Sequence, residues 1–395
     1  MTTRVLCLTY EYPPVGGGGG FVAESLARSL GTFGYEIDVV TSHLRGMPEL
    51  ETDGHLTVHR VPCLRFHRHY SNTLELAALL WPLYRKALTL ISSKQYDFNH
   101  THFALPTGVI AHRLWKRTGL SYALTLHGSD VPGYNPDRFS VAHAIMRPYW
   151  RKIVMEAKLV VSPSNFLAGL TAQHVRVPIS TVPNGYDPVA GTYPAKRNCI
   201  LVVTRMFERK GVQHFLEAIR DWDTDWEIFI AGDGPYLAKL SEIAKTVRPR
   251  VRFLGFLSRD RLAELYGAAR IFVFPSIQEN FPVVLLEAMH AGCAIVTTDA
   301  DGCAEVIGDA GIKTPPADPA AIREALLRLM HDPVATESYA EKARRRAEGF
   351  AWPRIARRYD DLFAKTFASN AGAGAAGSTP ASQPLQAQRG TGPAA

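Results

Sequence analysis

Short apolar runs alternate with helical patterns along almost the whole chain, and this alternation constrains the fold more than any other feature. The apolar runs are rich in branched and aromatic residues, as in buried strands, and helical periodicity fills most segments between them. In the first half the expected strands are Val5–Thr9, Ile37–Thr41, Leu56–Val61, Asn99–His102, Tyr122–Leu126, Leu159–Val161 and Ser180–Val182. In the second half they are Cys199–Thr204, Trp226–Ala231, Val251–Leu254, Ile271–Phe274 and Ala294–Thr298. This pattern predicts an α/β protein with parallel sheets built from βαβ units.

The two sets of strands are separated by residues 183–194, which contain Pro and Gly and show neither periodicity. The chain has 395 residues, too many for one typical domain, and its apolar content of 46% is enough for two cores. We therefore expect an N-terminal domain over residues 1–182, a hinge over 183–197, a C-terminal domain over 198–352, an amphipathic helix over 353–368 and a disordered tail over 369–395.

Charge and cysteine content narrow the class of protein. The net charge of +7 is modest for this length and favours anionic partners such as nucleotide phosphates or acidic lipid headgroups over nucleic acid. Five cysteines without a C-x-x-C pair predict thiols in a reducing compartment. We find no signal peptide and no run near the roughly twenty apolar residues that span a bilayer. These features predict a cytoplasmic protein, with peripheral contact at the inner face of the membrane as an open alternative.

Two carboxylates follow one of the expected strands. Glu279 lies in the loop after Ile271–Phe274, and Glu287 lies in the helix expected from Val283 to His290. Ligands of parallel sheets collect at this carboxyl end of the strands, where helix N-termini offer free N–H groups to phosphate. Carboxylates there are suited to hydroxyl groups, those of a transferred sugar for Glu279 and those of a ribose for Glu287. The spacing therefore predicts a sugar-nucleotide site.

Two cations follow the first strand of the second set. Arg205 and Lys210 lie between the strand Cys199–Thr204 and a helix expected over residues 212–220. Arg binds phosphate by a forked contact and Lys acts as a point charge, so the pair could neutralise a departing diphosphate.

A run of five glycines, residues 16–20, follows the first strand and precedes a helix expected from Phe21. Glycines permit close approach of a ligand to the backbone, and a helix start offers amides to an anion. A flexible loop without ligand contact is the alternative. A dinucleotide-binding fingerprint has similar glycines, but the second strand ends in Thr41-Ser42-His43, without the acidic residue that would hold a ribose.

In their order along the chain, these motifs resemble the retaining GT-B glycosyltransferases of family four, or glycosyl transferases group 1. The C-terminal half carries Arg205-x4-Lys210-Gly211, Gly232-Asp233-Gly234-Pro235 and Pro275-Ser276-x2-Glu279-x7-Glu287-Ala288-Met289. The N-terminal half carries the glycine run, Leu126-His127-Gly128-Ser129-Asp130 and Val182-Pro183-Asn184-Gly185-Tyr186-Asp187. The resemblance covers residues 4–367. It implies two Rossmann-like parallel-sheet domains facing across a cleft, with residues 353–368 crossing back to the N-domain.

The resemblance also implies a role for each matching position. Arg205 and Lys210 would bind the donor diphosphate, Glu287 the ribose and Glu279 the transferred sugar. The remaining expected site residues are His127, which would face the sugar from the N-domain, Gly18 and Gly20, which would let that domain close on the phosphates and acceptor, and Asn280, Phe281 and Val283, whose amides would lie near the donor. The triplet Asn280-Phe281-Pro282 departs from the family's glycine-rich pattern, which leaves the identity of the donor open.

The family's chemistry implies a retaining hexosyltransferase in which the acceptor attacks on the face that the diphosphate leaves, without a metal or cofactor. Asp221-x-Asp223 resembles a metal motif but precedes a strand, at the wrong edge of the sheet, and His100-x-His102 lacks a third ligand. Two other classes are open. A GT-B-type sugar-nucleotide epimerase would need acid/base carboxylates that we do not find, and the intact cations and carboxylates argue against a non-catalytic sugar-nucleotide-binding protein.

The sequence constrains the sugar donor, the acceptor and any membrane contact less than it constrains the type of reaction. We expect a UDP-sugar as donor, with GDP-mannose next, and a glycan, lipid-linked or small-molecule acceptor. Basic and aromatic residues adjoin a long apolar helical pattern over residues 65–95. We favour an ordinary N-domain helix packed on the sheet; the alternative is a helix that rests on an anionic membrane.

Overall fold

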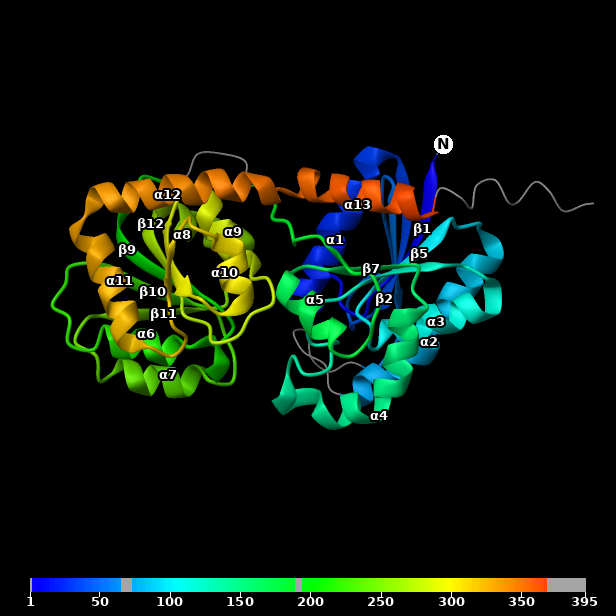
Figure 1. Cartoon of the computed structure of the whole chain (residues 1–395), viewed down its shortest axis with the longest axis horizontal. Coiled ribbons are helices and arrows are strands. Elements are labelled where there is room, and N and C mark those ends of the chain that lie inside the picture. Colours follow the sequence, from blue (N-terminus) through cyan, green and yellow to red (C-terminus); the bar gives the residue numbers. More distant parts are fainter. Residues whose placement is uncertain (1, 65–72, 189–193, 368–395) are drawn as a thin grey trace, which may run out of the picture.

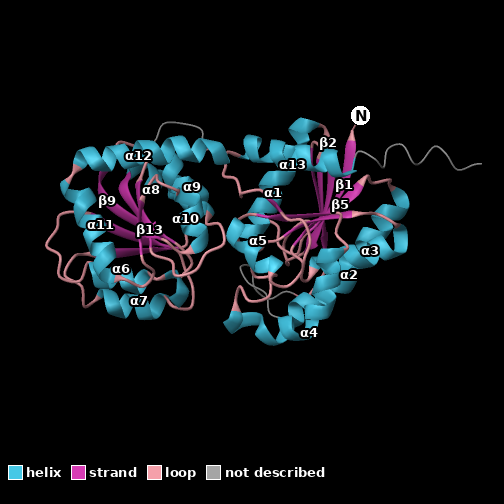
Figure 2. Ribbon diagram, in the orientation of Figure 1, coloured by secondary structure: helices cyan, strands magenta, loops and turns pink. Residues whose placement is uncertain are grey.

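The computed structural model describes residues 2–64, 73–188 and 194–367 and contains two separate β-sheets, each lying between layers of helices (Figure 1). Figure 2 shows the strands of each half gathered into one sheet, with the helices outside. This is the two-domain, Rossmann-like α/β architecture that the alternating pattern predicts.

The N-terminal sheet has the strand order β3-β4-β2-β1-β5-β6-β7-β8. Its strands are β1 (Thr3–Leu8), β2 (Tyr35–Ser42), β3 (Leu50–Asp53), β4 (Leu56–Val61), β5 (Phe98–His102), β6 (Tyr122–Thr125), β7 (Leu159–Ser162) and β8 (Ser180–Thr181). All neighbours run parallel except β3, which pairs antiparallel with β4. The predicted parallel arrangement is therefore confirmed except at this edge, where β3 was not predicted. The sequence analysis missed β3 because a short, polar and exposed edge strand carries no apolar run.

Two helical layers cover the N-terminal sheet. One consists of α2 (Thr73–Ser93), α3 (Thr107–Thr118) and α4 (Pro136–Met155), with α5 (Asn165–Ala172) beside them; the other consists of α1 (Gly18–Leu30) and α13 (Trp352–Phe367). Alternate strand residues supply the two cores. Leu6 and Leu8 face the layer of α2 to α4, whereas Val5 and Cys7 face α1 and α13.

The C-terminal sheet is entirely parallel, with the order β11-β10-β9-β12-β13-β14. Its strands are β9 (Arg197–Val203), β10 (Glu227–Ala231), β11 (Val251–Gly255), β12 (Ala269–Phe274), β13 (Ala294–Thr298) and β14 (Ile312–Thr314). The helices are α6 (Val212–Ala218), α7 (Leu237–Ala244) and α11 (Pro319–His331) on one face, and α8 (Arg259–Ala268), α9 (Val283–His290), α10 (Asp301–Ile307) and α12 (Pro333–Ala347) on the other. The short strand β14 was also not predicted from the sequence.

The last described helix returns to the N-terminal half. In α13, Ile355, Tyr359, Phe363 and Phe367 recur every four residues and are buried against α1 and the N-terminal sheet. Phe367 stacks on Phe98 of β5, with ring centroids 4.2 Å apart. Figure 1 shows α12 and α13 following one another along the same side of both halves. The expected tail, residues 369–395, and the basic-aromatic residues 65–70 lie outside the described residues.

The glycine run differs from its expected form. Helix α1 begins at Gly18, not at Phe21, so Gly18 and Gly20 belong to its first turn instead of to a loop. Buried Val22, Ala23 and Leu26 hold the helix on the sheet, which offsets the low intrinsic helix preference of the glycines.

Candidate active site

The two expected carboxylates lie after β12, one in a loop and one in a helix. Glu279 occupies the loop between β12 and α9, and Glu287 lies in the second turn of α9. The helix runs from Val283 to His290, as the sequence analysis predicted. Pro282 is its N-cap and offers no side-chain cap. The first amides of the helix therefore face the loop that carries Glu279.

Lys210 and Glu279 form a buried ion pair, 69 positions apart in the sequence. Lys210 is 7% exposed and Glu279 8% exposed. The hydroxyl of Ser276 also donates to the Oε1 atom of Glu279, at 2.9 Å. The carboxylate is thus held by two donors, and its orientation is fixed by groups on two different loops.

Gly211 makes this pairing geometrically possible. Its φ of 70° is in the left-handed region, and an added Cβ would lie 1.9 Å from the carbonyl oxygen of Pro275. The turn that carries Lys210 therefore lies directly against the end of β12, and this close approach brings the ammonium group to Glu279.

Burial lowers the pKa of Lys210. The carboxylate of Glu279 opposes that shift, whereas the charge of Arg205 adds to it. A buried charged pair contributes little net stability, but the loss of one partner leaves an uncompensated charge in the interior. A neutral side chain in place of Lys210 alone, or of Glu279 alone, should therefore destabilise the protein.

Glu287 lies in a different environment. The hydroxyl of Tyr266 on α8 donates to its Oε2 atom at 3.0 Å. Burial raises the pKa of Glu287, and the hydrogen bond from Tyr266 and the charge of Arg259 partly counter this. Both Tyr266 and Arg259 belong to α8, so this helix orients the carboxylate from one side.

Arg205 is exposed at the beginning of the segment that follows β9. An added Cβ on Gly17 would lie 3.7 Å from the Nη1 atom of Arg205, which shows how closely the two halves approach at this point. The side chain lies over the ring of Phe207, with its Cζ atom 5.6 Å from the ring centroid. The guanidinium thus faces the start of α1 across the boundary between the halves.

His127 follows β6 in the N-terminal half and contacts a second histidine. Its Nε2 atom lies 3.0 Å from the Nδ1 atom of His102, at the end of β5. Its ring packs on Phe103, with centroids 4.2 Å apart. Phe103 has a φ of 71°, a strained value for a bulky residue and one that proteins retain mainly at functional sites.

Gly19 completes the packing around this ring pair. An added Cβ would lie 2.4 Å from Phe103 and 3.3 Å from the Nδ1 atom of His127. By contrast, an added Cβ on Gly18 would meet no atom within 4 Å, and one on Gly20 would meet the backbone of Glu11 at 3.1 Å. Within the glycine run, Gly17 and Gly19 are therefore the residues next to Arg205 and His127, whereas the expected role of Gly18 and Gly20 in closing on the phosphates and acceptor stays a prediction.

Both histidines are neutral at ordinary pH. Burial lowers the pKa of His127 to about 3, with a smaller contribution from His100, and lowers the pKa of His102 well below its usual value. The ring of His100 packs against that of His102 at a tilt of 46°, and burial lowers the pKa of His100 to about 3 as well. The N-terminal half therefore faces the site with uncharged imidazole.

Asp130 fixes the backbone beneath His127. Its Oδ1 atom accepts from the amides of His127 and Gly128, both at 2.9 Å, and its Oδ2 atom accepts from the amide of Ala104 at 2.7 Å. The buried carboxylate of Asp130 thus joins the loop after β6 to the loop after β5. These bonds fix the backbone next to both histidines.

The loop after β12 contacts the N-terminal half directly. The side chain of Asn280 bonds to Ser164 and to the carbonyl of His127, and Gln278 donates to the carbonyl of Tyr134 at 2.7 Å. Phe281 is 7% exposed and packs in the core of the C-terminal half. Val283 is the first residue of α9. The carboxyl edges of the two sheets therefore meet at this loop.

Sequence patterns did not identify several of these residues. His102 and Gly19 act through contacts between segments far apart in the chain, and such contacts leave no local spacing to detect. Ser276 and Asp130 stand within the quoted motifs, but the sequence did not assign them a contact. In the sequence, His102 was considered as part of the His100-x-His102 pair. The HGSD segment was the one signal that could have indicated Asp130.

The sequence contains two motifs that resemble metal ligands, Asp221-x-Asp223 and His100-x-His102. Asp221 and Asp223 precede β10, at the amino edge of the sheet, where they line a cavity of about 540 Å³. Within residues 2–64, 73–188 and 194–367, no group of three or more His, Cys, Asp or Glu side chains is arranged to hold a metal ion. Over the same residues, no helix combines the length and apolar character needed to cross a membrane.

Sequence models of two glycosyltransferase families match consecutive parts of the chain. The model for Glycosyltransferase Family 4 matches residues 16–189, and that for Glycosyl transferases group 1 matches residues 188–346. Each expected site residue lies within one of these two ranges.

Curated and solved proteins match over most of their length. N-acetyl-alpha-D-glucosaminyl L-malate synthase of Bacillus anthracis is 26% identical over 382 residues, covering 89% of this chain and 94% of that protein. Sucrose-phosphate synthase of Thermosynechococcus elongatus superposes with a TM-score of 0.78 at 22% identity, covering 93% of this chain and all of that one. The Anabaena protein HepE, solved in complex with UDP and glucose, gives a TM-score of 0.72 at 18% identity, covering 92% of this chain and all of that one.

Proposed function

Since this chain belongs to the glycosyltransferases of the GT-B fold, we propose that it moves a hexose-type sugar from a nucleoside-diphosphate sugar to an acceptor hydroxyl, with retention of the anomeric configuration. The observation that carries the proposal is the buried Lys210–Glu279 pair, with Arg205 on the same edge and Glu287 in the adjoining helix. Residues 1–182 form the acceptor side in this proposal, and residues 198–352 the donor side.

The cations act on the leaving group. As the bond from the anomeric carbon to the diphosphate breaks, negative charge grows on the phosphate oxygens, and Arg205, Lys210 and the first amides of α9 stabilise it. The ammonium group of Lys210 has three N–H donors. One bonds to Glu279, and the others can donate to a phosphate oxygen. Buried cations act in a low dielectric, so their effect exceeds that of exposed ones.

The carboxylates and His127 hold the sugar nucleotide. Glu279, oriented by Lys210 and Ser276, accepts hydrogen bonds from hydroxyls of the transferred sugar, and Glu287 accepts them from the ribose. Neutral His127 faces the sugar from the N-terminal half. Its low pKa suits it for positioning and makes it a poor base near neutral pH.

The bond changes balance without an enzymic nucleophile. The acceptor oxygen forms a bond to the anomeric carbon on the face that the diphosphate leaves. The hydroxyl proton passes to the departing phosphate oxygen. Because the leaving group serves as the base, the reaction needs positioning and charge stabilisation more than a proton-accepting side chain.

The donor is proposed as a UDP-sugar, with GDP-mannose as second choice. The support is that HepE was solved with UDP and glucose. A panel of UDP-, GDP- and ADP-sugars with sugar, glycan and lipid acceptors tests the function, with the product anomer read by NMR. Transfer with retention is the expected result. An inverted product, epimerised donor or tight nucleotide binding without any turnover would contradict it.

A peripheral membrane contact extends the proposal to a lipid-linked acceptor. On the outer face of α2, Leu74 is 76% exposed and Trp81 64% exposed, with exposed Arg85 one turn beyond. On α4, Ile145 is 73% exposed, and Arg151 and Lys152 are exposed. Apolar side chains next to cations match an anionic lipid surface at the cytoplasmic side.

Vesicle flotation tests this contact. Wild-type protein should float with phosphatidylglycerol-containing vesicles and stay behind with pure phosphatidylcholine, and Trp81→Ser should weaken flotation. Phe256→Ser is the matched control, since Phe256 is 72% exposed on the other half. Equal behaviour of wild type and Trp81→Ser would rule out this face.

A further inference from the structure

The side-chain amide of Asn280 bridges the two halves of the molecule. Its Oδ1 atom accepts from the hydroxyl of Ser164 at 2.6 Å, and its Nδ2 atom donates to the carbonyl of His127 at 3.2 Å. Asn280 is 6% exposed and Ser164 is fully buried. Both ends of the amide therefore bond to the opposite half.

The neighbouring groups determine which way the amide points. The carbonyl of His127 can only accept, so it must face the NH₂ group of Asn280. The hydroxyl of Ser164 already accepts from the amide of Leu167 as the N-cap of α5, so its own proton is directed to the Asn280 oxygen. An aspartate in this position would retain the Ser164 bond and oppose the His127 carbonyl with a second oxygen.

The loop that carries Asn280 is also held from within its own half. An added Cβ on Gly302 of α10 would lie 1.9 Å from the carbonyl oxygen of Asn280. The amide of Gly302 donates to the carbonyl of Glu279 at 3.3 Å. A movement of the Asn280 side chain is therefore transmitted to Glu279 by a loop that has little room to bend.

A second link between the halves lies beside the first. Glu305 of α10 accepts from the amide and the side chain of Asn165, the first residue of α5, at 2.8 to 3.0 Å. Its carboxylate thus lies at the N-terminus of α5, where a negative charge is favourable. Ser164 and Asn165 therefore dock on Asn280 and Glu305 as adjacent pairs.

We propose that Asn280 is a positioning residue that fixes His127 relative to Glu279 and so holds the acceptor half in register with the donor half. This inference rests on the proposed function for its kinetic consequence only. It also gives a physical meaning to the Asn280-Phe281-Pro282 departure, because a glycine at position 280 has no side chain with which to make the bridge.

The kinetic consequence follows from where the donor groups lie. Arg205, Lys210, Glu279 and Glu287 all belong to the C-terminal half, so nucleotide binding does not require the bridge. Transfer requires His127 and the acceptor side as well. Loss of the bridge should therefore lower kcat and leave nucleotide affinity nearly unchanged.

The decisive variant is Asn280→Asp, which is close to isosteric. We expect kcat to fall about tenfold and the Kd for UDP to stay within about twofold, because one buried hydrogen bond becomes a contact between two acceptors. Small-angle scattering of the nucleotide-free protein should show a larger radius of gyration. Asn198→Asp, an exposed change on β9 whose side chain accepts from Arg270, is the matched control and should alter none of these quantities.

A double-mutant cycle separates positioning from loss of fold. Ser164→Ala removes the cap of α5 as well as the bridge, so its single effect is ambiguous. Asn280→Ala and Ser164→Ala together should cost less in kcat than the product of the single effects, because the second change finds no partner left. Additive losses, an unchanged radius of gyration in Asn280→Asp or a matching loss of UDP affinity would overturn the inference. Should wild type transfer no sugar, the proposed function fails, whereas the scattering comparison still tests the bridge.

Discussion

The two halves of the site present different side chains: the C-terminal half presents charged groups, and the N-terminal half presents neutral histidines. Lys210 and Glu279 form a buried ion pair, with Arg205 and Glu287 nearby. Across from them, His102 and His127 are uncharged, and Gly17 and Gly19 bring the backbone close. The contrast supports the proposed division of work, in which the C-terminal half would bind the charged donor and the N-terminal half would position the acceptor.

The largest effect is expected at Lys210. Lys210→Met should lower transfer by about 10²- to 10³-fold, because the departing diphosphate loses its buried cation. It should also lower the free energy of unfolding by about 3 kcal/mol, since Glu279 is left without its partner in the interior. Initial rates and urea unfolding measure the two effects.

The double variant Lys210→Met/Glu279→Gln distinguishes the two effects. With neither charge present, stability should return toward that of wild type, whereas activity should stay lost. Recovery of activity together with stability would show that the pair serves the fold alone. It would contradict the assignment of donor binding to the charged C-terminal half.

A smaller effect is expected at His127. His127→Gln should lower kcat by about 10- to 100-fold, because the ring that faces the sugar is replaced by a shorter, more mobile amide. With a pKa near 3, His127 should not contribute a step to the pH profile of kcat between pH 5.5 and 8. A step near pH 6.5 that disappears in His127→Gln would show that the residue titrates during catalysis.

Acid should destabilise the N-terminal half through its buried histidines. Burial lowers the pKa of His100 and His127 to about 3, so the unfolded chain binds more protons than the folded chain between about pH 6.5 and 3. Stability is therefore complete above about pH 6.5 and falls with acidification, by about 1 kcal/mol per pH unit per histidine. Thermal unfolding of wild type and His100→Gln from pH 7.5 to 4.5 measures this slope, which should be shallower in the variant. Equal slopes would contradict it.

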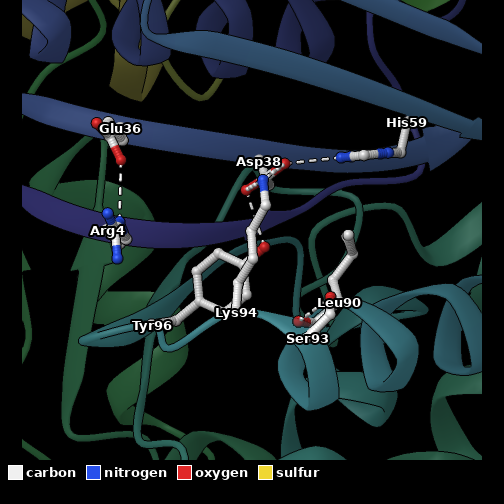
Figure 3. A network of polar contacts seen from close by, with 8 residues as sticks. All are labelled: Arg4, Glu36, Asp38, His59, Leu90, Ser93, Lys94 and Tyr96. Atoms are coloured by element: carbon white, nitrogen blue, oxygen red, sulfur yellow. Dashed lines mark hydrogen bonds and ion pairs between the residues drawn. The ribbon is translucent and has the colours of Figure 1, made fainter.

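The smallest effect on activity is expected at the amino edge of the N-terminal sheet. Figure 3 shows Asp38 of β2 surrounded by donors from His59, Lys94 and Tyr96, at 2.7 to 3.1 Å. Burial raises the pKa of Asp38, but these hydrogen bonds outweigh it and bring the pKa to about 2. The stability that Asp38 provides is present above about pH 4 and is lost as the pH falls through about 2.

Asp38→Asn should lower the free energy of unfolding by about 1 to 2 kcal/mol at pH 7 and leave transfer unchanged, because the network lies at the edge opposite the site. Differential scanning calorimetry and initial rates measure both. A loss of kcat comparable to that of His127→Gln would show that the N-terminal half cannot be divided into a functional and a structural edge.

Local sequence patterns predicted the fold and the charged half better than the neutral half. The positions of Glu279, Glu287 and Arg205 could be predicted because each follows a buried strand at a spacing that strand and helix geometry impose, whereas their roles in binding stay predictions. The direct pairing of Lys210 with Glu279 could not, since it depends on how two loops 69 positions apart meet. The helix start at Gly18 was missed for a related reason: tertiary packing of Val22 and Leu26 overrides the local preference of glycine.

Contacts between the halves were the least predictable feature. Asn280 was expected to offer its backbone to the donor, yet its side chain is bonded to Ser164 and His127. Nothing in the local sequence of either segment indicates the other. The same is true of Asn165 at the start of α5 and Glu305 of α10, which are 140 positions apart.

Isothermal titration of UDP, with GDP in parallel, tests the central division of work most directly. Wild type, Glu287→Gln and His127→Gln form the comparison, because the first change lies in the charged half and the second in the neutral half. The account predicts that Glu287→Gln weakens nucleotide binding about tenfold, by loss of charge-assisted bonds to the ribose, and that His127→Gln binds as wild type does. Equal weakening in both variants, or unchanged binding in Glu287→Gln, would contradict it.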